Sequence, residues 1–300
     1  MKIDTHVHCT LEKTPIGFGT PNLPESHYIA DPVELMTHLR KQGTGRAILM
    51  SNGDQDSPVE GGSHNKACWQ IAAQYPDFYS WMCCFQEADT SSVYERMATC
   101  KEQGAVGVGE LSINQWISHS SIQEIFRCAE LLELPVVFHM SPEPGFQYGI
   151  CDRPGLPLLE KALIQYPRLK FIGHSQPFWM ELSGHVPTAT RERSGIGEGP
   201  IQPGGRVPAL MEAYPNLYAD LSAYSGNCAI LRDEEFGLDF LERFRDRLLF
   251  ATDSLNRYSL FPLGKFLDDS LANGRLSRQA YHNICYENAQ ELFHLPPLCL

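Results

Sequence analysis

The feature that most constrains this chain is a recurring alternation of short apolar runs with longer amphipathic stretches. Several of the runs are nearly continuous in Val, Ile, Leu and Phe, as expected of parallel strands that are buried on both faces. The runs cover residues 3–8, 46–50, 78–85, 105–111, 135–140, 169–174, 217–222 and 248–253. This alternation is typical of α/β proteins, built either as a closed (β/α)8 barrel or as an open, doubly wound sheet.

The stretches between the runs carry helix signals. Residues 31–34 offer an Asp N-cap, a proline at the first helical position and a glutamate three residues after the cap. Ser121 and Glu124 repeat the capping-box spacing, and residues 159–166 place apolar side chains on one helical face. A last helix is expected from about Ser277 to Phe293.

The number of strand candidates favours the barrel, and two long connections agree with it. Residues 9–30 and 176–205 both follow the carboxyl end of an expected strand, and both are rich in Gly and Pro. Barrel enzymes build pockets and lids from loops on that face. Because no break in composition marks a second domain, we predict one (β/α)8 TIM-barrel domain over residues 1–300, with long loops at the C-terminal face of the strands.

Composition narrows the partners and the compartment. The chain has 24 Lys and Arg against 36 Asp and Glu, a net charge of −12, which disfavours binding to nucleic acid. No apolar run approaches the roughly 20 residues of a membrane helix. The N-terminus lacks a signal-peptide pattern, and the ten cysteines include no C-x-x-C pair. We therefore expect a cytoplasmic protein with reduced thiols and a small-molecule substrate.

Side chains of the metal-ligand type stand at the carboxyl ends of five of the runs. Period-2 alternation puts the first two histidines on one face of the first strand, where they can converge on one ion. The set is His6, His8, Glu110, His139, His174 and Asp253. Four imidazoles and two carboxylates on one rim suit Zn²⁺ or a similar divalent ion such as Mn²⁺.

With these residues the sequence resembles the amidohydrolase superfamily, and most closely its amidohydrolase-2 branch of metal-dependent TIM-barrel hydrolases. The resemblance rests on Asp4-x-His6-x-His8 together with His139, His174 and Asp253, and it covers essentially the whole chain. Supporting stretches are residues 204–206, 216–222, 248–254 and 287–293. The branch's decarboxylases lack a ligand on the fourth strand, whereas here Glu110 stands where two-metal members carry a bridging Glu or carboxylated Lys. That departure favours two metals and hydrolysis.

The resemblance implies a division of roles in the site. His6, His8 and Asp253 would hold one ion, and His139 and His174 a second, with Glu110 bridging the two. Asp253 would act as general base and then general acid toward a water activated by the metal. With only one ion bound, His174 would instead donate a hydrogen bond to the substrate. Asp4 points to the same face as His6, so it is a candidate to support the ligands from behind, with a purely structural role as the alternative.

The expected reaction is cleavage of a C–O or C–N bond in a small ester, lactone or amide. Substrates that carry a carboxylate group are included in this expectation. Arginines in the loops after the strands are candidates to bind that carboxylate. Aromatic side chains in the same loops are candidates for apolar pocket walls. The substrate-binding candidates are Arg153, Arg206, Arg257 and Trp179, with Arg191, Arg193, Trp116, Phe146 and Tyr148 as further loop residues.

Several alternatives remain open. One is a mononuclear decarboxylase or hydratase of the same superfamily, and another is a catalytically silent barrel that acts as a binding protein. The stretch around Ser175 half resembles a nucleophile elbow but lacks its final glycine. A metal-dependent deoxyribonuclease is disfavoured by the negative charge. A homodimer is an option that the sequence does not decide.

Overall fold

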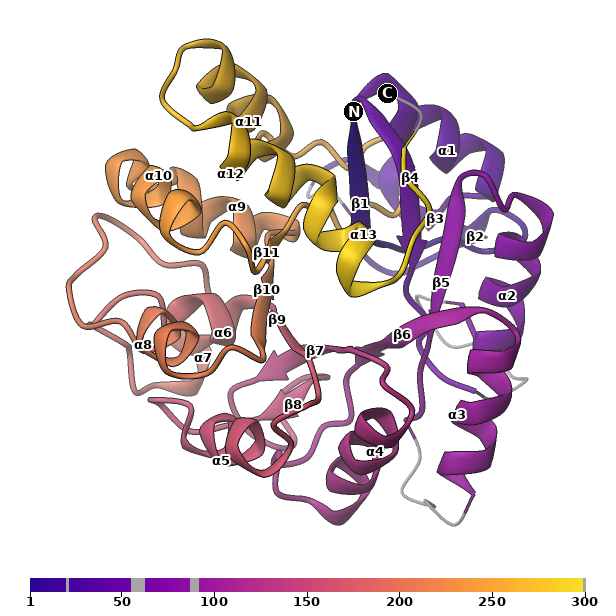
Figure 1. Cartoon of the computed structure of the whole chain (residues 1–300), viewed down its shortest axis with the longest axis horizontal. Helices are drawn as coiled ribbons and strands as arrows, with labels where there is room; N and C mark the ends of the chain where they lie inside the picture. Colours follow the sequence, from indigo (N-terminus) through magenta and orange to yellow (C-terminus); the bar gives the residue numbers. More distant parts are fainter. Residues whose placement is uncertain (20–21, 55–62, 87–91, 299–300) are drawn as a thin grey trace.

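Eight parallel strands follow one another around a ring in the computed structural model of this chain, which describes residues 1–19, 22–54, 63–86 and 92–298 (Figure 1). In order around the ring they are β1 (Lys2–Val7), β4 (Thr44–Leu49), β5 (Tyr79–Cys83), β6 (Ala105–Leu111), β7 (Val136–Ser141), β9 (Phe171–His174), β10 (Leu217–Asp220) and β11 (Leu248–Leu249). The ring closes between its first and last strands: Val7 pairs with Ser254, and the Thr5 N–H donates to the Phe250 carbonyl at 3.0 Å. The (β/α)8 prediction is confirmed.

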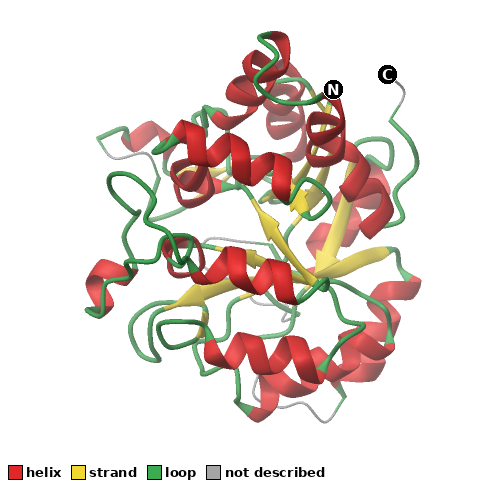
Figure 2. Ribbon diagram, turned by 60° about the vertical axis from the view of Figure 1, so that its left-hand side comes forward, coloured by secondary structure: helices red, strands yellow, loops and turns green. Residues whose placement is uncertain are grey.

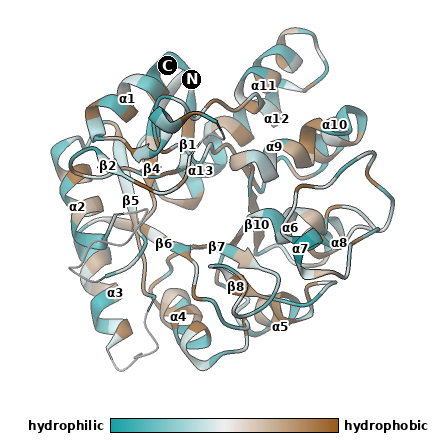
Figure 3. Cartoon of the chain, turned by 180° about the vertical axis from the view of Figure 1, so that it is seen from behind, coloured by the Kyte–Doolittle hydropathy of each residue, from teal (hydrophilic) through white to brown (hydrophobic). Residues whose placement is uncertain are grey.

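Helices alternate with these strands and lie outside the ring (Figures 1 and 2). They are α1 (Pro32–Lys41), α2 (Asn65–Gln74), α3 (Val93–Glu102), α4 (Ser120–Leu131), α5 (Pro157–Gln165), α6 (Gln176–Met180), α7 (Thr190–Arg193), α8 (Arg206–Ala213), α9 (Ala223–Leu231), α10 (Glu234–Arg243), α11 (Leu263–Ala272), α12 (Arg278–His282) and α13 (Asn288–Leu292). Coloured by hydropathy, they carry both hydrophilic and hydrophobic residues, as amphipathic helices packed on a sheet do (Figure 3).

The strands are buried on both faces because side chains fill the ring inside and helices cover it outside. Every residue of β1 and of β7 is buried. Glycine allows one close approach next to the site: a Cβ added at Gly173 would lie 2.3 Å from the ring of Phe178. That glycine lets α6 pack directly against β9 and fixes the start of the following loop.

The helix boundaries confirm most of the sequence-based expectations. Asp31 caps α1 by accepting from the Val33 and Glu34 N–H groups at 2.9 and 3.0 Å. The capping box at Ser121 is wrong, because α4 begins at Ser120, two residues earlier than that box predicts, and its N-cap is His119, whose Nδ1 accepts from the Ser121 N–H. The last helix runs as expected but passes through a π-helical turn, η2 (Asn283–Glu287), between α12 and α13.

The two long connections fold locally at the C-terminal face. The first contains a short antiparallel pair, β2 (Thr14–Pro15) and β3 (Tyr28–Ile29), and the 3₁₀ turn η1 (Pro24–Ser26), while its residues 20–21 lie outside the described part. The second contains α6 and α7. A further short strand, β8 (Ile150–Cys151), pairs with Met140 and Ser141, the last two residues of β7.

Two further expectations concern cysteines and membranes. The nine cysteines in the described part of the chain are free thiols, and eight of them are buried. No helix among the described residues is long and apolar enough to cross a membrane.

Candidate metal centre

The structure brings all six predicted ligand residues together at the carboxyl ends of their strands. Five of them lie within two residues of the end of their strand and Asp253 follows the end of β11 by four residues, so the barrel directs them to one rim. They are His6, His8, Glu110, His139, His174 and Asp253. Five of them are buried and the Asp253 side chain is 28% exposed.

His6, His8 and Asp253 form one half of the cluster. The Nε2 atoms of the two histidines lie 3.3 Å apart, and Oδ1 of Asp253 lies 3.3 Å from His8 Nε2 and 3.7 Å from His6 Nε2. Asp253 reaches this place from a left-handed backbone conformation (φ 61°), held by its own N–H, which donates to the His6 carbonyl at 2.8 Å. These three donors face a common point.

Glu110 lies between that half and the other two histidines. Its Oε1 atom is 2.7 Å from His139 Nδ1 and 3.5 Å from His174 Nε2. Its Oε2 atom is 3.6 Å from His8 Nε2 and 3.9 Å from His6 Nε2. One carboxylate therefore presents a separate oxygen to each pair of histidines.

Asp220 also belongs to the cluster, although the sequence analysis did not name it as a site residue. It ends β10, is buried, and places Oδ2 2.7 Å from His6 Nδ1. The signal was available, because Asp220 is a ligand-type residue at the end of an apolar run, like the six that were named. It contacts Nδ1 of His6 from behind, whereas the other carboxylates lie near Nε2.

The donor atoms fit divalent cations. An ionised carboxylate only accepts, so Nδ1 of His6 donates to Asp220, and Nε2 is the nitrogen left to bind an ion. Nε2 faces His8 Nε2 at 3.3 Å, with oxygens of Asp253 and Glu110 within 3.7 and 3.9 Å. Two groups of these atoms are each close enough to share an ion: His6, His8 and Asp253, and His6, Glu110 and His174. Imidazole and carboxylate together are the ligands of zinc and related metals.

The carboxylates of the cluster create a negative potential that stabilises positive charge at this site, even without an ion. Burial opposes a charged His6 most strongly, but Asp220, Asp253 and Glu110 together outweigh it and raise the pKa of His6 to about 10. Burial likewise opposes ionisation of Glu110 and Asp220. The surrounding histidines nevertheless hold the pKa of both carboxyl groups well below the usual range. A divalent cation supplies this charge without a proton.

Asp4, the expected supporting residue, binds two backbone N–H groups and the Thr252 hydroxyl and not the imidazoles. Its carboxylate accepts from the His6 N–H at 3.2 Å, the Thr252 N–H at 3.0 Å and the Thr252 hydroxyl at 2.6 Å. Burial raises the pKa of Asp4 to about 7 despite these hydrogen bonds. Asp4 thus joins β1 to the segment that carries Asp253.

None of the four predicted substrate-binding residues lies within hydrogen-bond distance of a side chain of the histidine cluster in the described structure, and their role stays a prediction. Arg206 donates to the Gly155 carbonyl at 2.8 Å and pairs with Glu160. Arg153 lies over the ring of Trp116, and Arg257 over the ring of Tyr258. Trp179 is buried and its indole N–H donates to the Asp220 carbonyl at 3.1 Å, which supports the site from outside.

Among the further loop residues, Tyr148 approaches the cluster and Arg193 braces a loop beside it. The Tyr148 ring lies 4.3 Å from the His139 ring and is 62% exposed. Asn114 holds this loop by donating to the Gly149 carbonyl at 3.2 Å. Arg193 is buried and donates to the Pro142 and Asp152 carbonyls, each at 3.2 Å.

The geometry does not support Ser175 as a nucleophile. Its hydroxyl is buried, accepts from the Met140 N–H at 2.8 Å and donates to the Met140 carbonyl at 3.1 Å. The residue has φ 86°, so the strand does turn sharply here, but the side chain serves to join β7 to β9.

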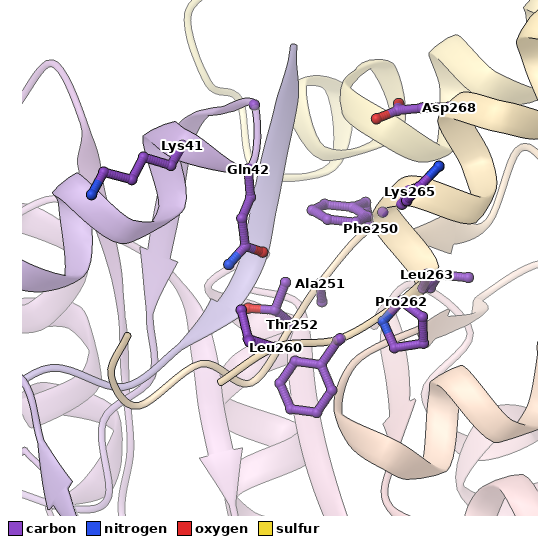
Figure 4. Close-up of a pocket in the computed structure, with 13 residues that line it drawn as sticks. Lys41, Gln42, Phe250, Ala251, Thr252, Leu260, Pro262, Leu263, Lys265 and Asp268 are labelled. Carbon is purple, nitrogen blue, oxygen red and sulfur yellow. The ribbon is translucent and has the colours of Figure 1, made fainter. Parts of the chain in front are cut away.

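A cavity of about 680 Å³ lies apart from the cluster, between the end of α1 and α11 (Figure 4). Its walls include Gln42, Phe250 and Leu263, and none of the six ligand residues lines it. Lys2, at the start of β1, contacts two of its walls: it lies 5.7 Å from the Phe250 ring and pairs with Asp268 at 2.7 Å. The cavity therefore lies on the outside of the barrel and has no part in the metal centre.

Comparison with known proteins places these features in context. A family model described as amidohydrolase matches residues 3–295. No curated protein sequence matches the chain. Among solved structures, an uncharacterised TIM-barrel protein from Bordetella bronchiseptica is 14% identical with a TM-score of 0.65, and each chain is covered to 98%.

Two further structures of the same fold carry functional names. A 2,6-dihydroxybenzoate decarboxylase from Rhizobium is 15% identical with a TM-score of 0.59, again with 98% of both chains covered. A probable 2-pyrone-4,6-dicarboxylic acid hydrolase from Acinetobacter baumannii is 16% identical with a TM-score of 0.55, covering 98% of this chain and 99% of that one. At these identities the likeness establishes the fold.

Proposed function

Because the chain belongs to the amidohydrolase family, whose members are metal-dependent enzymes, we propose that it is a hydrolase that cleaves a C–O or C–N bond in a small ester, lactone or amide. A carboxylated substrate is included in the proposal. His6, His8 and Asp253 would hold one ion and His139 and His174 a second, with Glu110 between them. Zinc suits this donor set, and manganese is the alternative.

The ions, when bound, lower the pKa of a water molecule and polarise the scissile carbonyl. The protein's own contribution is to place a proton acceptor beside that water. Asp253 suits this task because its side chain is 28% exposed while the histidines around it are buried. Its carboxylate takes the proton of the attacking water and returns it to the leaving group.

The observation that carries the proposal is the position of Glu110. A carboxylate with one oxygen 2.7 Å from His139 and the other 3.6 Å from His8 is placed to bridge two ions. In a site for one ion, His6, His8 and Asp253 would suffice, and a strand-end carboxylate between the two pairs would have no role.

The test is Glu110→Gln, which keeps the size and removes the charge. The matched control is Glu235→Gln, since Glu235 is exposed on α10. Wild-type and variant proteins are loaded with zinc or manganese, assayed for bound metal, and screened on esters, lactones and amides. We expect two ions per wild-type chain, one in Glu110→Gln, and loss of most hydrolysis in that variant alone. Full metal content and full activity in Glu110→Gln would contradict the proposal.

The second candidate is a mononuclear decarboxylase or hydratase, favoured by the grouping of His6, His8 and Asp253 as a complete three-ligand site. Structures with this fold include enzymes named as 2,6-dihydroxybenzoate decarboxylase and 5-carboxyvanillate decarboxylase. In that case the wild type binds one ion, releases CO₂ from a carboxylated substrate, and tolerates Glu110→Gln. A protein that binds no metal and stays inactive would indicate the silent barrel.

A further inference from the structure

One buried carboxylate contacts two histidines that come from opposite parts of the sequence. Oδ2 of Asp220 lies 2.7 Å from Nδ1 of His6, and Oδ1 lies 3.5 Å from Nδ1 of His174. The two imidazole rings are themselves 4.6 Å apart, and all three residues are at most 1% exposed. The proposed function assigns these two histidines to different ions.

We propose that Asp220 is the positioning residue of the whole metal centre, because it holds the proton of both His6 and His174 on Nδ1 and turns both Nε2 lone pairs toward the ions. The inference rests on the proposed function, since it concerns the same site. Beyond that function, it states that both ion positions depend on Asp220, so that loss of this carboxylate weakens the binding of both ions together.

The need for such a residue follows from the chemistry of imidazole. A neutral imidazole carries one proton, and only the other nitrogen can bind a metal, so whatever bonds to Nδ1 decides whether Nε2 is free. An ionised carboxylate accepts and never donates, so it selects the Nδ1–H form. For His6, Asp220 is the partner that the described structure provides at Nδ1.

His174 shows why a hydroxyl alone would not be enough. The Ser222 Oγ atom lies 3.0 Å from its Nδ1, but a hydroxyl can donate as well as accept and therefore permits either tautomer. Glu110 Oε1 lies 3.5 Å from Nε2 and favours a proton on that nitrogen, the wrong one for binding a metal. Asp220 is the acceptor-only group on the Nδ1 side.

Asp220 is itself held in one orientation. Its Oδ1 accepts from the Ser222 N–H at 2.7 Å, and its carbonyl accepts from the Trp179 indole at 3.1 Å. The carboxylate thus points one oxygen at each histidine without depending on any ion. Such supporting groups typically change metal affinity by about 10- to 100-fold when removed.

The experiment compares Asp220→Asn with Ser222→Ala as the matched control. Asn keeps the size of the side chain, while Ala removes a hydroxyl that contacts only one of the two histidines and keeps the N–H that orients Asp220. Zinc affinity and stoichiometry are measured by competition with a coloured chelator, and the melting temperature of each metal-free protein is recorded.

We expect Asp220→Asn to weaken the binding of both ions by about 10- to 100-fold, with the metal-free protein still folded, and Ser222→Ala to spare the ion at His6. Unchanged affinity in Asp220→Asn, or an equal loss in Ser222→Ala, would overturn the inference while leaving the proposed function in place. A wild type that binds no zinc would overturn both.

A second measurement needs no variant and keeps the inference falsifiable if Asp220→Asn fails to fold. Long-range ¹⁵N–¹H spectra of the zinc-loaded wild type report which nitrogen of each histidine carries the proton. We expect Nδ1–H for His6 and for His174. A proton on Nε2 of either residue would overturn the inference.

Discussion

Oδ1 of Asp253 lies 3.3 Å from Nε2 of His8, so a carboxylate in a left-handed backbone conformation faces an imidazole at the end of the first strand. The pair joins the two ends of the sequence, because β1 and the segment after β11 close the barrel here. The most exposed of the proposed ligands thus lies beside a buried one.

Asp253→Asn tests the role of this carboxylate in proton transfer. Asn tolerates positive φ, so the variant keeps the backbone that Asp253 adopts at φ 61°. We expect kcat on the best substrate of the screen to fall by about 10²- to 10⁴-fold at equal metal content, with the metal-free wild type and variant melting at similar temperatures. The control is Asp269→Asn, since Asp269 is exposed on α11. Normal turnover in Asp253→Asn at full metal content would exclude this residue as the base.

Removal of metal is expected to lower thermal stability. An ion that binds only the folded chain stabilises it by about 2.7 kcal/mol at a free concentration 100 times its dissociation constant. The melting temperature should therefore fall by several degrees on chelation and recover when zinc is added back. Identical melting curves with and without chelator would mean that the folded protein holds no ion.

Tyr148→Ala tests the predicted pocket wall. The ring lies 4.3 Å from His139 but is 62% exposed, so its loss should cost little stability and act on substrate binding. We expect KM to rise with a smaller effect on kcat. Tyr224→Ala is the matched control, because Tyr224 is 59% exposed and packs on Phe261. If both variants keep the wild-type KM, Tyr148 does not contact the substrate.

The dependence of stability on pH is predicted at Asp152, a buried residue outside the cluster. Burial raises the pKa of Asp152 to about 6 from 3.8, although it accepts from the Leu158 and Leu159 N–H groups. The folded chain then binds this proton more tightly than the unfolded chain. Its stabilising contribution is present below pH 4 and is lost as pH rises through about 6, a change of up to about 3 kcal/mol.

The measurement is urea unfolding between pH 4.5 and 7 for the wild type and for Asp152→Asn, whose side chain does not ionise. We expect the free energy of unfolding of the wild type to fall relative to that of the variant as pH rises. A constant difference across this range would show that Asp152 titrates normally.

Gly173→Ala tests the packing that positions the His174 strand end. The added Cβ would lie 2.3 Å from the Phe178 ring, and overpacking of this kind costs about 1–3 kcal/mol. Gly264→Ala on α11 is the control, because its Cβ would lie 3.4 Å from Phe250 in ordinary contact. Chemical denaturation should show a loss only for Gly173→Ala.

The barrel and the convergence of the six ligand residues could be predicted because both follow from local pattern. Apolar runs define the strands, and a residue at a strand's carboxyl end must face the same rim as its counterparts. The N-cap at Asp31 was predictable for the same reason, since it depends on the next few residues alone.

What could not be predicted depends on pairs that are distant in sequence. The contact of Asp220 with His6 joins residues 214 positions apart, and no local signal states that a strand-end carboxylate lies behind an imidazole. The pairing of Arg206 with Glu160 is equally non-local. Nothing in the neighbouring residues indicated that Arg206, unlike the other loop arginines, is paired with a glutamate. At α4, the spacing of Ser121 and Glu124 matched a capping box, but the N-cap of the helix is His119.

The most direct test of the account is a crystal structure of the zinc-loaded protein, with diffraction data collected at the zinc absorption edge. If Glu110 bridges two ions, two anomalous peaks will lie on either side of its carboxylate, one beside His6, His8 and Asp253 and one beside His139 and His174. No anomalous peak among these side chains, or zinc bound only elsewhere on the barrel, would contradict it.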